Sequence, residues 1–273
     1  MKQVTQLLAG CLFGWLFLSA ANAETLTIPG SGNPEYVLGE LAKEFNARHT
    51  AHQVVIPPST GTAGALRAVT EGSAGMGRIG RPLTSEERGG LIYRPLGRDP
   101  VAFVGGAGVS VRNITRSQVT DVYLGKSTNW RDIGGKSATI RAIGREVTDA
   151  SRQAIMRNID TFSGISLHES IKVVHLDPQM IELLDRYPSS LGFMNRSALF
   201  AAKTRLVVLA LDSIEPNPEN VEHGRYPLWL EIGLIYKSGA LSDAGRAFLM
   251  FVDSPAGVQI LRTHGVIVNT AKR

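Results

Sequence analysis

Three short segments of this chain combine hydroxyl, glycine, amide or charged residues immediately before predicted helices. They are Gly30-Ser31-Gly32-Asn33, Ser59-Thr60-Gly61-Thr62, and the loop from Arg145 to Ser151. A helix N-terminus exposes unpaired backbone N–H groups and carries about half a positive charge, so residues of these types at that place form a socket for an anion. The chemistry that these segments predict is anion binding.

The candidate ligand-binding residues come from these three segments and from the end of the third predicted strand. Arg145 carries a planar fork of donors that suits a tetrahedral oxyanion, and Arg81 ends that strand. Ordinary helix capping explains any one such loop, because Ser, Thr, Asn and Asp are preferred N-caps. Three of them, distributed over two halves of the chain, favour one shared site, called below the predicted anion site. Its residues are Ser31, Gly32, Asn33, Ser59, Thr60, Gly61, Thr62, Arg81, Arg145, Asp149, Ala150 and Ser151.

Sequence motifs typical of nucleotide-binding proteins occur in this chain, but the neighbouring elements or residues that such motifs require are missing. The stretch Gly75 to Gly80 has dinucleotide-loop spacing, but it follows a predicted helix and is itself predicted as a strand. Gly125-Lys126-Ser127 and Gly135-Lys136-Ser137 lack the earlier glycine of a P-loop. The sequence has no G-x-S-x-G or H-E-x-x-H motif, and no pair among its six histidines has metal-ligand spacing with a cysteine or carboxylate. We expect no cofactor, no metal and no enzymatic activity, while a hydrolase site assembled from distant residues stays open.

The first half of the chain alternates strand-like and helix-like runs, which predicts an α/β architecture with a mainly parallel sheet. Apolar positions at helical spacing predict a helix over Glu35–Arg48, with Asn33 as N-cap and Pro34 in the first turn. The other predicted elements here are strands at Thr25–Ile28, Gln53–Ile56 and Gly77–Gly80, and a helix at Ala63–Glu71.

The second half repeats the alternation and then returns to the first. Strands are predicted at Val101–Val104, Thr139–Ile143, Lys172–Val174, Leu191–Met194 and Leu228–Tyr236, and helices at Asn113–Tyr123, Thr148–Ile159, Ser242–Val252 and Pro255–His264, with a polar loop at Asp212–Arg225. A chain that leaves one unit near residue 104 and returns near 228 makes two lobes joined by two crossings. We predict a first lobe of 24–104 plus 229–273, a second of 105–228, hinges near 101–106 and 226–230, and a cleft between the lobes.

The N-terminal segment predicts export. Lys2 precedes an apolar run from Leu7 to Ala20, and Ala21-Asn22-Ala23 fits a signal-peptidase site, so cleavage is expected after Ala23. Removal of 23 of the 273 residues leaves 250 without cysteine, which suits an oxidising periplasm. A rival interpretation makes Cys11, in Leu8-Ala9-Gly10-Cys11, a lipid attachment point.

The overall charge is positive without pointing to nucleic acid. The formal net charge is +5 and 43% of residues are hydrophobic, as in a globular chain. The arginines are dispersed among acidic residues and aromatic residues make up only 7%, so no nucleic-acid partner is expected. The positive balance favours anions near a cleft.

The order of motifs resembles the periplasmic phosphate-binding proteins of ABC transporters. The motifs are Pro29-Gly30-Ser31-Gly32, Ser59-Thr60-Gly61-Thr62, Arg98-Asp99-Pro100-Val101-Ala102, Leu124-Gly125-Lys126-Ser127-Thr128-Asn129-Trp130, Gly144-Arg145-Glu146 and Leu191-Gly192-Phe193, with a matching last helix. The resemblance implies a two-lobed type II periplasmic binding fold, a Venus flytrap. It also implies that hydroxyls and main-chain amides hold phosphate in the cleft, that the partner is an ABC permease in the inner membrane, and that no reaction is catalysed. The expected state is a monomer.

Two positions depart from the family pattern. Arg81 stands where the family has an aspartate that accepts the proton of hydrogen phosphate, and Asp149-Ala150-Ser151-Arg152 stands where it reads Ser-Gly-Thr-Arg. In one account Asp149 pairs with Arg81 or takes over as proton acceptor. In the other, Arg81 neutralises a fully deprotonated or larger anion while Asp149 turns outward as a helix cap. Two other functions stay open: a receptor, signalling or matrix protein with an altered or lost ligand, and a secreted phosphoester-processing enzyme.

Overall fold

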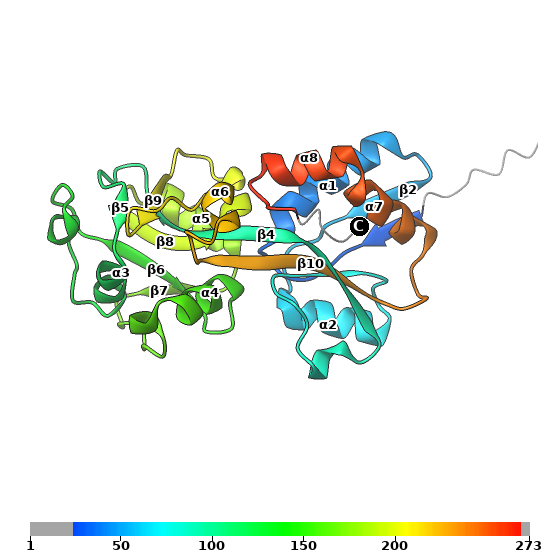
Figure 1. Cartoon of the computed structure of the whole chain (residues 1–273), viewed down its shortest axis with the longest axis horizontal. Helices are drawn as coiled ribbons and strands as arrows, with labels where there is room; N and C mark the ends of the chain where they lie inside the picture. Colours follow the sequence, from blue (N-terminus) through cyan, green and yellow to red (C-terminus); the bar gives the residue numbers. More distant parts are fainter. Residues whose placement is uncertain (1–23, 269–273) are drawn as a thin grey trace, which may run out of the picture.

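Two lobes lie side by side and share two long strands (Figure 1). The computed structural model describes residues 24–268; the predicted signal peptide of residues 1–23 and its Cys11 lie outside them. Strand β4 (Leu91–Gly105) runs from the first lobe into the second, and β10 (Trp229–Lys237) runs back beside it. These two strands are the two predicted crossings.

The first lobe carries both ends of the described chain. Its parallel pair β1 and β2 packs with α1, and its two last helices are joined at Ser254, which caps the second of them. Its elements are β1 (Glu24–Thr27), α1 (Glu35–Arg48), β2 (His52–Val55), α2 (Gly61–Glu71), β3 (Gly77–Ile79), η1 (Glu86–Arg88), α7 (Asp243–Asp253) and α8 (Pro255–Thr263).

The second lobe is built between the two crossings. Its helix α3 begins with a capping box in which Thr115 and Gln118 bind each other's backbone N–H groups. Its elements are β5 (Asn113–Ile114), α3 (Arg116–Tyr123), η2 (Trp130–Ile133), β6 (Arg141–Arg145), α4 (Ala150–Asn158), η3 (Asp160–Phe162), β7 (Lys172–Val174), α5 (Asp177–Arg186), β8 (Ser190–Asn195), η4 (Arg196–Ala201), β9 (Val207–Leu211) and α6 (Pro218–Glu222).

The main sheet is mixed, so the prediction of a mainly parallel sheet was wrong. Its strand order is β3-β10-β4-β8-β6-β7. Off this path, β9 pairs with β4, and β5 pairs with β9. The β3–β10, β10–β4, β4–β8 and β4–β9 pairs are antiparallel, and only β8–β6, β6–β7 and β5–β9 are parallel. The physical reason is the second crossing, because a chain that returns between lobes beside its outgoing strand must run antiparallel to it.

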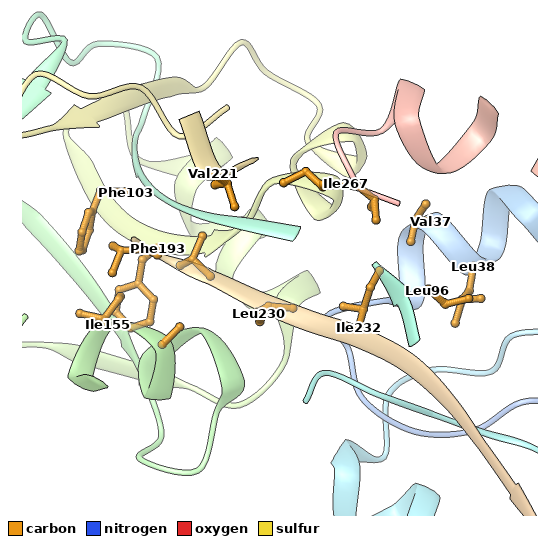
Figure 2. Packing of buried hydrophobic residues seen from close by; sticks show 14 of the residues in the cluster. Val37, Leu38, Leu96, Phe103, Ile155, Phe193, Val221, Leu230, Ile232 and Ile267 are labelled. Atoms are coloured by element: carbon orange, nitrogen blue, oxygen red, sulfur yellow. The ribbon is translucent and has the colours of Figure 1, made fainter. Parts of the chain in front are cut away.

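Apolar side chains on both lobes pack along these crossing strands (Figure 2). Leu96 and Ile232 pack at the end next to α1, whereas Phe103 and Phe193 lie at the other end, with ring centroids 6.2 Å apart. All of these side chains are buried. The crossing strands therefore belong to the core of each lobe. This packing positions the loops that lie at the ends of the neighbouring strands.

Candidate functional site

The loop after β1 is folded by its own backbone and by a neighbouring strand. Ser31 N donates to the carbonyl of Arg78 at 2.9 Å, and Gly30 has φ 142°, a conformation that L side chains rarely adopt. A Cβ on Gly30 would meet the Arg78 carbonyl oxygen at 2.0 Å. Ser31 Oγ donates to Asn33 Oδ1 at 3.1 Å, and both side chains are buried. The loop is therefore a preformed structure.

The loop after β2 is tied to the first. Thr60 N and Ser59 Oγ both donate to the carbonyl of Gly30, at 2.9 and 3.1 Å. Gly61 N donates to Ser59 Oγ at 3.3 Å, and Gly61 has φ 72° at the start of α2. Two of the three predicted segments thus form one unit on the first lobe.

The buried side chain of Arg78 links the loops that follow β1 and β2. Its guanidinium is fully buried and donates to the carbonyls of Ile28, Ser31 (2.9 Å) and Pro57 (2.7 Å), and to Glu35 Oε2 (2.9 Å). Burial lowers the pKa of Arg78, and the Glu35 carboxylate opposes that shift. Because these carbonyls point at Arg78, it organises both loops.

Arg145, at the end of β6, lies in a cluster of carboxylates on the second lobe. Its Nη1 donates to Asp177 Oδ1 at 2.5 Å, and its Nη2 lies 2.9 Å from Asp149 Oδ2 and donates to the His175 carbonyl at 3.1 Å. Arg152 Nη1 donates to the Arg145 carbonyl at 2.7 Å. Burial disfavours the charged guanidinium, but the Asp177 and Asp149 carboxylates outweigh it and raise the pKa of Arg145. Glu146 Oε2 lies 3.7 Å from Arg145 Nε, so the site contains a permanent cation that is held in place by three acidic side chains.

Asp149 has two roles at the start of α4. Its side chain accepts a hydrogen bond from Arg152 N at 2.9 Å, which caps the helix, and it also pairs with Arg145. Burial raises the pKa of Asp149 to about 6, even though Arg145 favours the ionised form. Asp149 can therefore take up a proton close to neutral pH.

Four buried polar atoms of this cluster have no hydrogen-bond partner among residues 24–268: Arg145 Nε, Glu146 Oε2, Arg152 Nε and Asp177 Oδ2. Two of them, Arg145 Nε and Glu146 Oε2, lie 3.7 Å apart as an ion pair. Asp177 Oδ2 lies 2.5 Å from the position that a Cβ on Gly32 would take, so it touches the loop of the opposite lobe. Buried polar atoms are normally hydrogen-bonded, so four that lack a hydrogen bond in one cluster mark a place suited to a polar guest.

Hydrogen bonds between the lobes run beside this cluster. Asn33 Nδ2 donates to Ser151 Oγ and Asn195 Oδ1, both at 3.3 Å, and Asn195 Nδ2 donates to the Asn33 carbonyl at 2.9 Å. Asn195 also donates to Asp99 Oδ2 at 2.7 Å on the crossing strand β4. The lobes are thus closed on each other at the predicted anion site.

A cavity of about 730 Å³ opens beside these contacts. Both lobes line it, through Thr62 and Arg81 on one side and Ala150 and Arg157 on the other, with Trp229 and Glu231 of β10 forming part of its wall. No group of three or more His, Cys, Asp or Glu side chains in the described part of the chain is placed to hold a metal ion. No helix between residues 24 and 268 is long and apolar enough to cross a bilayer.

A family model described as a PBP superfamily domain matches residues 18–256 of this sequence. The chain belongs to the PBP superfamily. Its fold, two lobes around a mixed sheet with two crossing strands, is that of the type II periplasmic binding proteins.

Curated relatives with distant sequences are similar over most of the chain. The phosphate-binding protein PstS of Bacillus subtilis is 23% identical over 239 residues, which cover 84% of this chain and 75% of that protein. PstS of Borreliella burgdorferi is 21% identical over 253 residues, 90% of each protein.

Solved structures with low sequence identity share the fold of this chain. A putative phosphate ABC transporter substrate-binding protein with bound phosphate from Clostridium perfringens superposes with a TM-score of 0.78 at 23% identity, covering 90% of this chain and 100% of that one. An ABC-type phosphate transport receptor from Vibrio cholerae gives a TM-score of 0.66 at 22% identity, covering 89% and 100%.

Within this superfamily fold, most of the predicted site residues meet at the cleft, but Arg81 does not pair as expected. Both of its Nη groups bind the Glu87 carboxylate at 2.7 Å, and this contact lowers the pKa of Glu87 to about 2. The pairing of Arg81 with Asp149 was therefore wrong. Asp149 does cap α4, but it is buried and does not turn outward.

Asn33 also differs from its prediction. The helix α1 begins at Glu35 after Pro34, and no side chain caps it. Asn33 instead uses its amide to bind Ser151 and Asn195 across the cleft. Between the lobes the Asn33 amide both donates and accepts hydrogen bonds, whereas a helix cap would use only its oxygen.

Two important residues were missed by the sequence reasoning. Arg78 lies inside the glycine-rich stretch Gly75 to Gly80, whose spacing is that of a dinucleotide loop without its context. The one sequence signal for its role is an arginine in a short strand whose other residues are small or apolar and buried. Asp177 begins α5, a helix that was not predicted, although Pro178 and the buried Met180, Ile181 and Leu184 give it a helical pattern.

Proposed function

We propose that this chain is an exported solute-binding protein that captures phosphate, or a related small oxyanion, between its lobes and delivers it to an ABC permease in the inner membrane. The observation that carries the proposal is the contact between the lobes at Asp177: this residue pairs with Arg145 on the second lobe, and its Oδ2, which has no hydrogen-bond partner among residues 24–268, lies against Gly32 of the first. Membership of the superfamily and the similarity to phosphate-binding proteins support the same conclusion.

The first lobe would supply hydroxyls and backbone N–H groups, and the second the charge. Ser31 and Thr60 lie in the loops that follow β1 and β2, and the N-terminus of α4 adds its dipole to the guanidinium of Arg145. An anion that contacts both lobes stabilises the closed form because it binds that form better than the open one. Hinge bending near 101–106 and 226–230 would then connect capture and release.

The carboxylates around Arg145 would make capture depend on protons. An anion beside Arg145 also lies beside Asp149, and like charges at short range are unfavourable. Burial already raises the pKa of Asp149 to about 6, and a bound anion would raise it further. We therefore expect proton uptake on binding and tighter binding as the pH falls from 7 to 5.

A second candidate is a receptor that kept the fold and lost the ligand. The pairing of Arg145 with both Asp149 and Asp177 favours it, because the two carboxylates already occupy the donors that an oxyanion would use.

Calorimetric titration of residues 24–273 with inorganic phosphate tests the proposal. We expect saturable binding of one ion per chain, weakened at least tenfold in Arg145→Lys. Lysine keeps the charge between Asp149 and Asp177 but loses the planar fork. Arg186→Lys, exposed on α5 of the same lobe, is the control and should bind as the wild type does. Absence of phosphate binding in a folded wild-type chain would favour the second candidate.

A further inference from the structure

The cavity between the lobes is larger than a small oxyanion needs. At about 30 Å³ for each water, its 730 Å³ has room for about 24 water molecules. A phosphate ion has only five non-hydrogen atoms. Pockets of about 300–1,000 Å³ are those in which proteins bind organic ligands. This cavity therefore has room for a ligand much larger than a phosphate ion.

The cavity adjoins the predicted anion site. Gly80 lines it, and a Cβ on Gly80 would lie 2.5 Å from Asn33 Oδ1 and 3.2 Å from Ser31 Oγ. Ala150 also lines it and stands between Asp149 and Ser151 at the start of α4. One molecule could thus extend from the anion site into the cavity.

The far wall of the cavity carries an arginine that is available to a ligand. Arg157 is exposed and has no hydrogen bond or ion pair to another residue between 24 and 268. Arg81 differs, because Glu87 already neutralises it. Ala150 and Arg157 are seven residues apart on α4, which is about 10 Å along the helix axis.

The remaining wall is partly apolar. Trp229 is half-buried there, with the Arg98 guanidinium 5.4 Å from its ring centroid, and Pro227 and Leu230 lie on either side of it in sequence. Glu231 adds a negative charge at this wall. An uncharged carbon chain fits such a surface better than a second phosphate would.

We infer that the ligand is an organic phosphorus anion, a phosphomonoester or phosphonate, with its phosphoryl group at the predicted anion site, its carbon chain along Trp229 and a second anionic group at Arg157. This inference rests on the proposed function, because it places the phosphoryl group at the same site. It adds the class of molecule to which that group belongs.

Titration of the mature chain with three probes tests the inference. They are inorganic phosphate, propylphosphonate, and 3-phosphonopropionate, which adds a terminal carboxylate. We expect 3-phosphonopropionate to bind at least tenfold more tightly than phosphate, with propylphosphonate between them. Arg157→Gln should remove the advantage of 3-phosphonopropionate over propylphosphonate, whereas Arg262→Gln, at an exposed arginine of α8 outside the cavity, should keep it.

The outcomes separate this inference from the proposed function. If phosphate binds as tightly as both phosphonates, or more tightly, the inference is wrong and the proposed function stands. If 3-phosphonopropionate keeps its advantage in Arg157→Gln, the assignment of the second anionic group is overturned. If none of the three probes binds the folded chain, both proposals fail together.

Discussion

Replacement of Asp149 by asparagine should strengthen anion binding at neutral pH. Asparagine keeps the shape and can still cap α4 by accepting from Arg152 N, but it removes a buried negative charge 2.9 Å from Arg145. An anion in contact with Arg145 would lie about 6 Å from that carboxylate. At an effective dielectric constant of about 20, one unit of like charge at that distance costs about 3 kcal/mol. Relaxation and solvent reduce this, so we expect a gain in affinity of about tenfold to 100-fold.

The pH dependence of that gain makes the test specific. Burial raises the pKa of Asp149 to about 6, so the wild-type side chain is ionised at pH 7.5 and largely protonated at pH 5. The ratio of the two dissociation constants should therefore be large at pH 7.5 and close to one at pH 5. Isothermal titration calorimetry with phosphate measures the ratio, in which the titration of phosphate itself cancels. The exposed Asp160→Asn serves as the matched control.

Two results would refute this reasoning. A ratio that stays constant from pH 5 to 7.5 would mean that Asp149 does not lie beside the ligand. A weaker asparagine variant would mean that Asp149 accepts a proton from the bound ion, which is the acceptor role left open by the sequence.

Three further predictions follow from the contacts of single residues. Gly32→Ala puts a Cβ 2.5 Å from Asp177 Oδ2 of the opposite lobe, so phosphate affinity should fall at least tenfold and small-angle X-ray scattering should show a more open molecule; unchanged affinity would contradict this. Asp177→Asn should reduce the preference for phosphate over sulfate at least tenfold in competition titrations, because Asp177 Oδ2 is an unpaired acceptor for a proton that hydrogen phosphate carries and sulfate lacks; an unchanged preference would count against that role. Burial raises the pKa of Asp99 from 3.8 to about 6, so the folded chain binds more protons between these values, and this residue's contribution to stability is lost as pH rises from 4 to 7, by up to about 3 kcal/mol. The difference in urea unfolding free energy between wild type and Asp99→Asn should change by that amount over the same range; a constant difference would exclude it.

Local signals in the sequence sufficed for much of the fold. The strand at Lys172–Val174 and the start of α8 at Pro255 are confirmed, because an apolar run and a proline after a serine cap act within a few residues. The strand β9 has an equally clear apolar run, Val207–Leu211, and was missed along with α5. The antiparallel pairing of β4 and β10 depends on where the chain returns, which no local pattern records.

The residue types of the site could be predicted from the sequence, but the contacts between those residues could not. The two loops of the first lobe and Arg145 were found because glycine and hydroxyl residues before helices have a general physical meaning. The contact of Asp177 with the Gly32 loop joins positions far apart in sequence on opposite lobes, so it exists only after the lobes meet. The role of Arg78 is equally nonlocal, since its acceptors belong to three segments: the stretch after β1, helix α1 through Glu35, and the loop after β2.

The position of a phosphate ion in a crystal structure of residues 24–273 tests the central claim most directly. The account predicts one ion that contacts Arg145 of the second lobe and at least one of Ser31 and Thr60 of the first. An ion bound to one lobe alone, or away from Arg145 in a closed molecule, would contradict it.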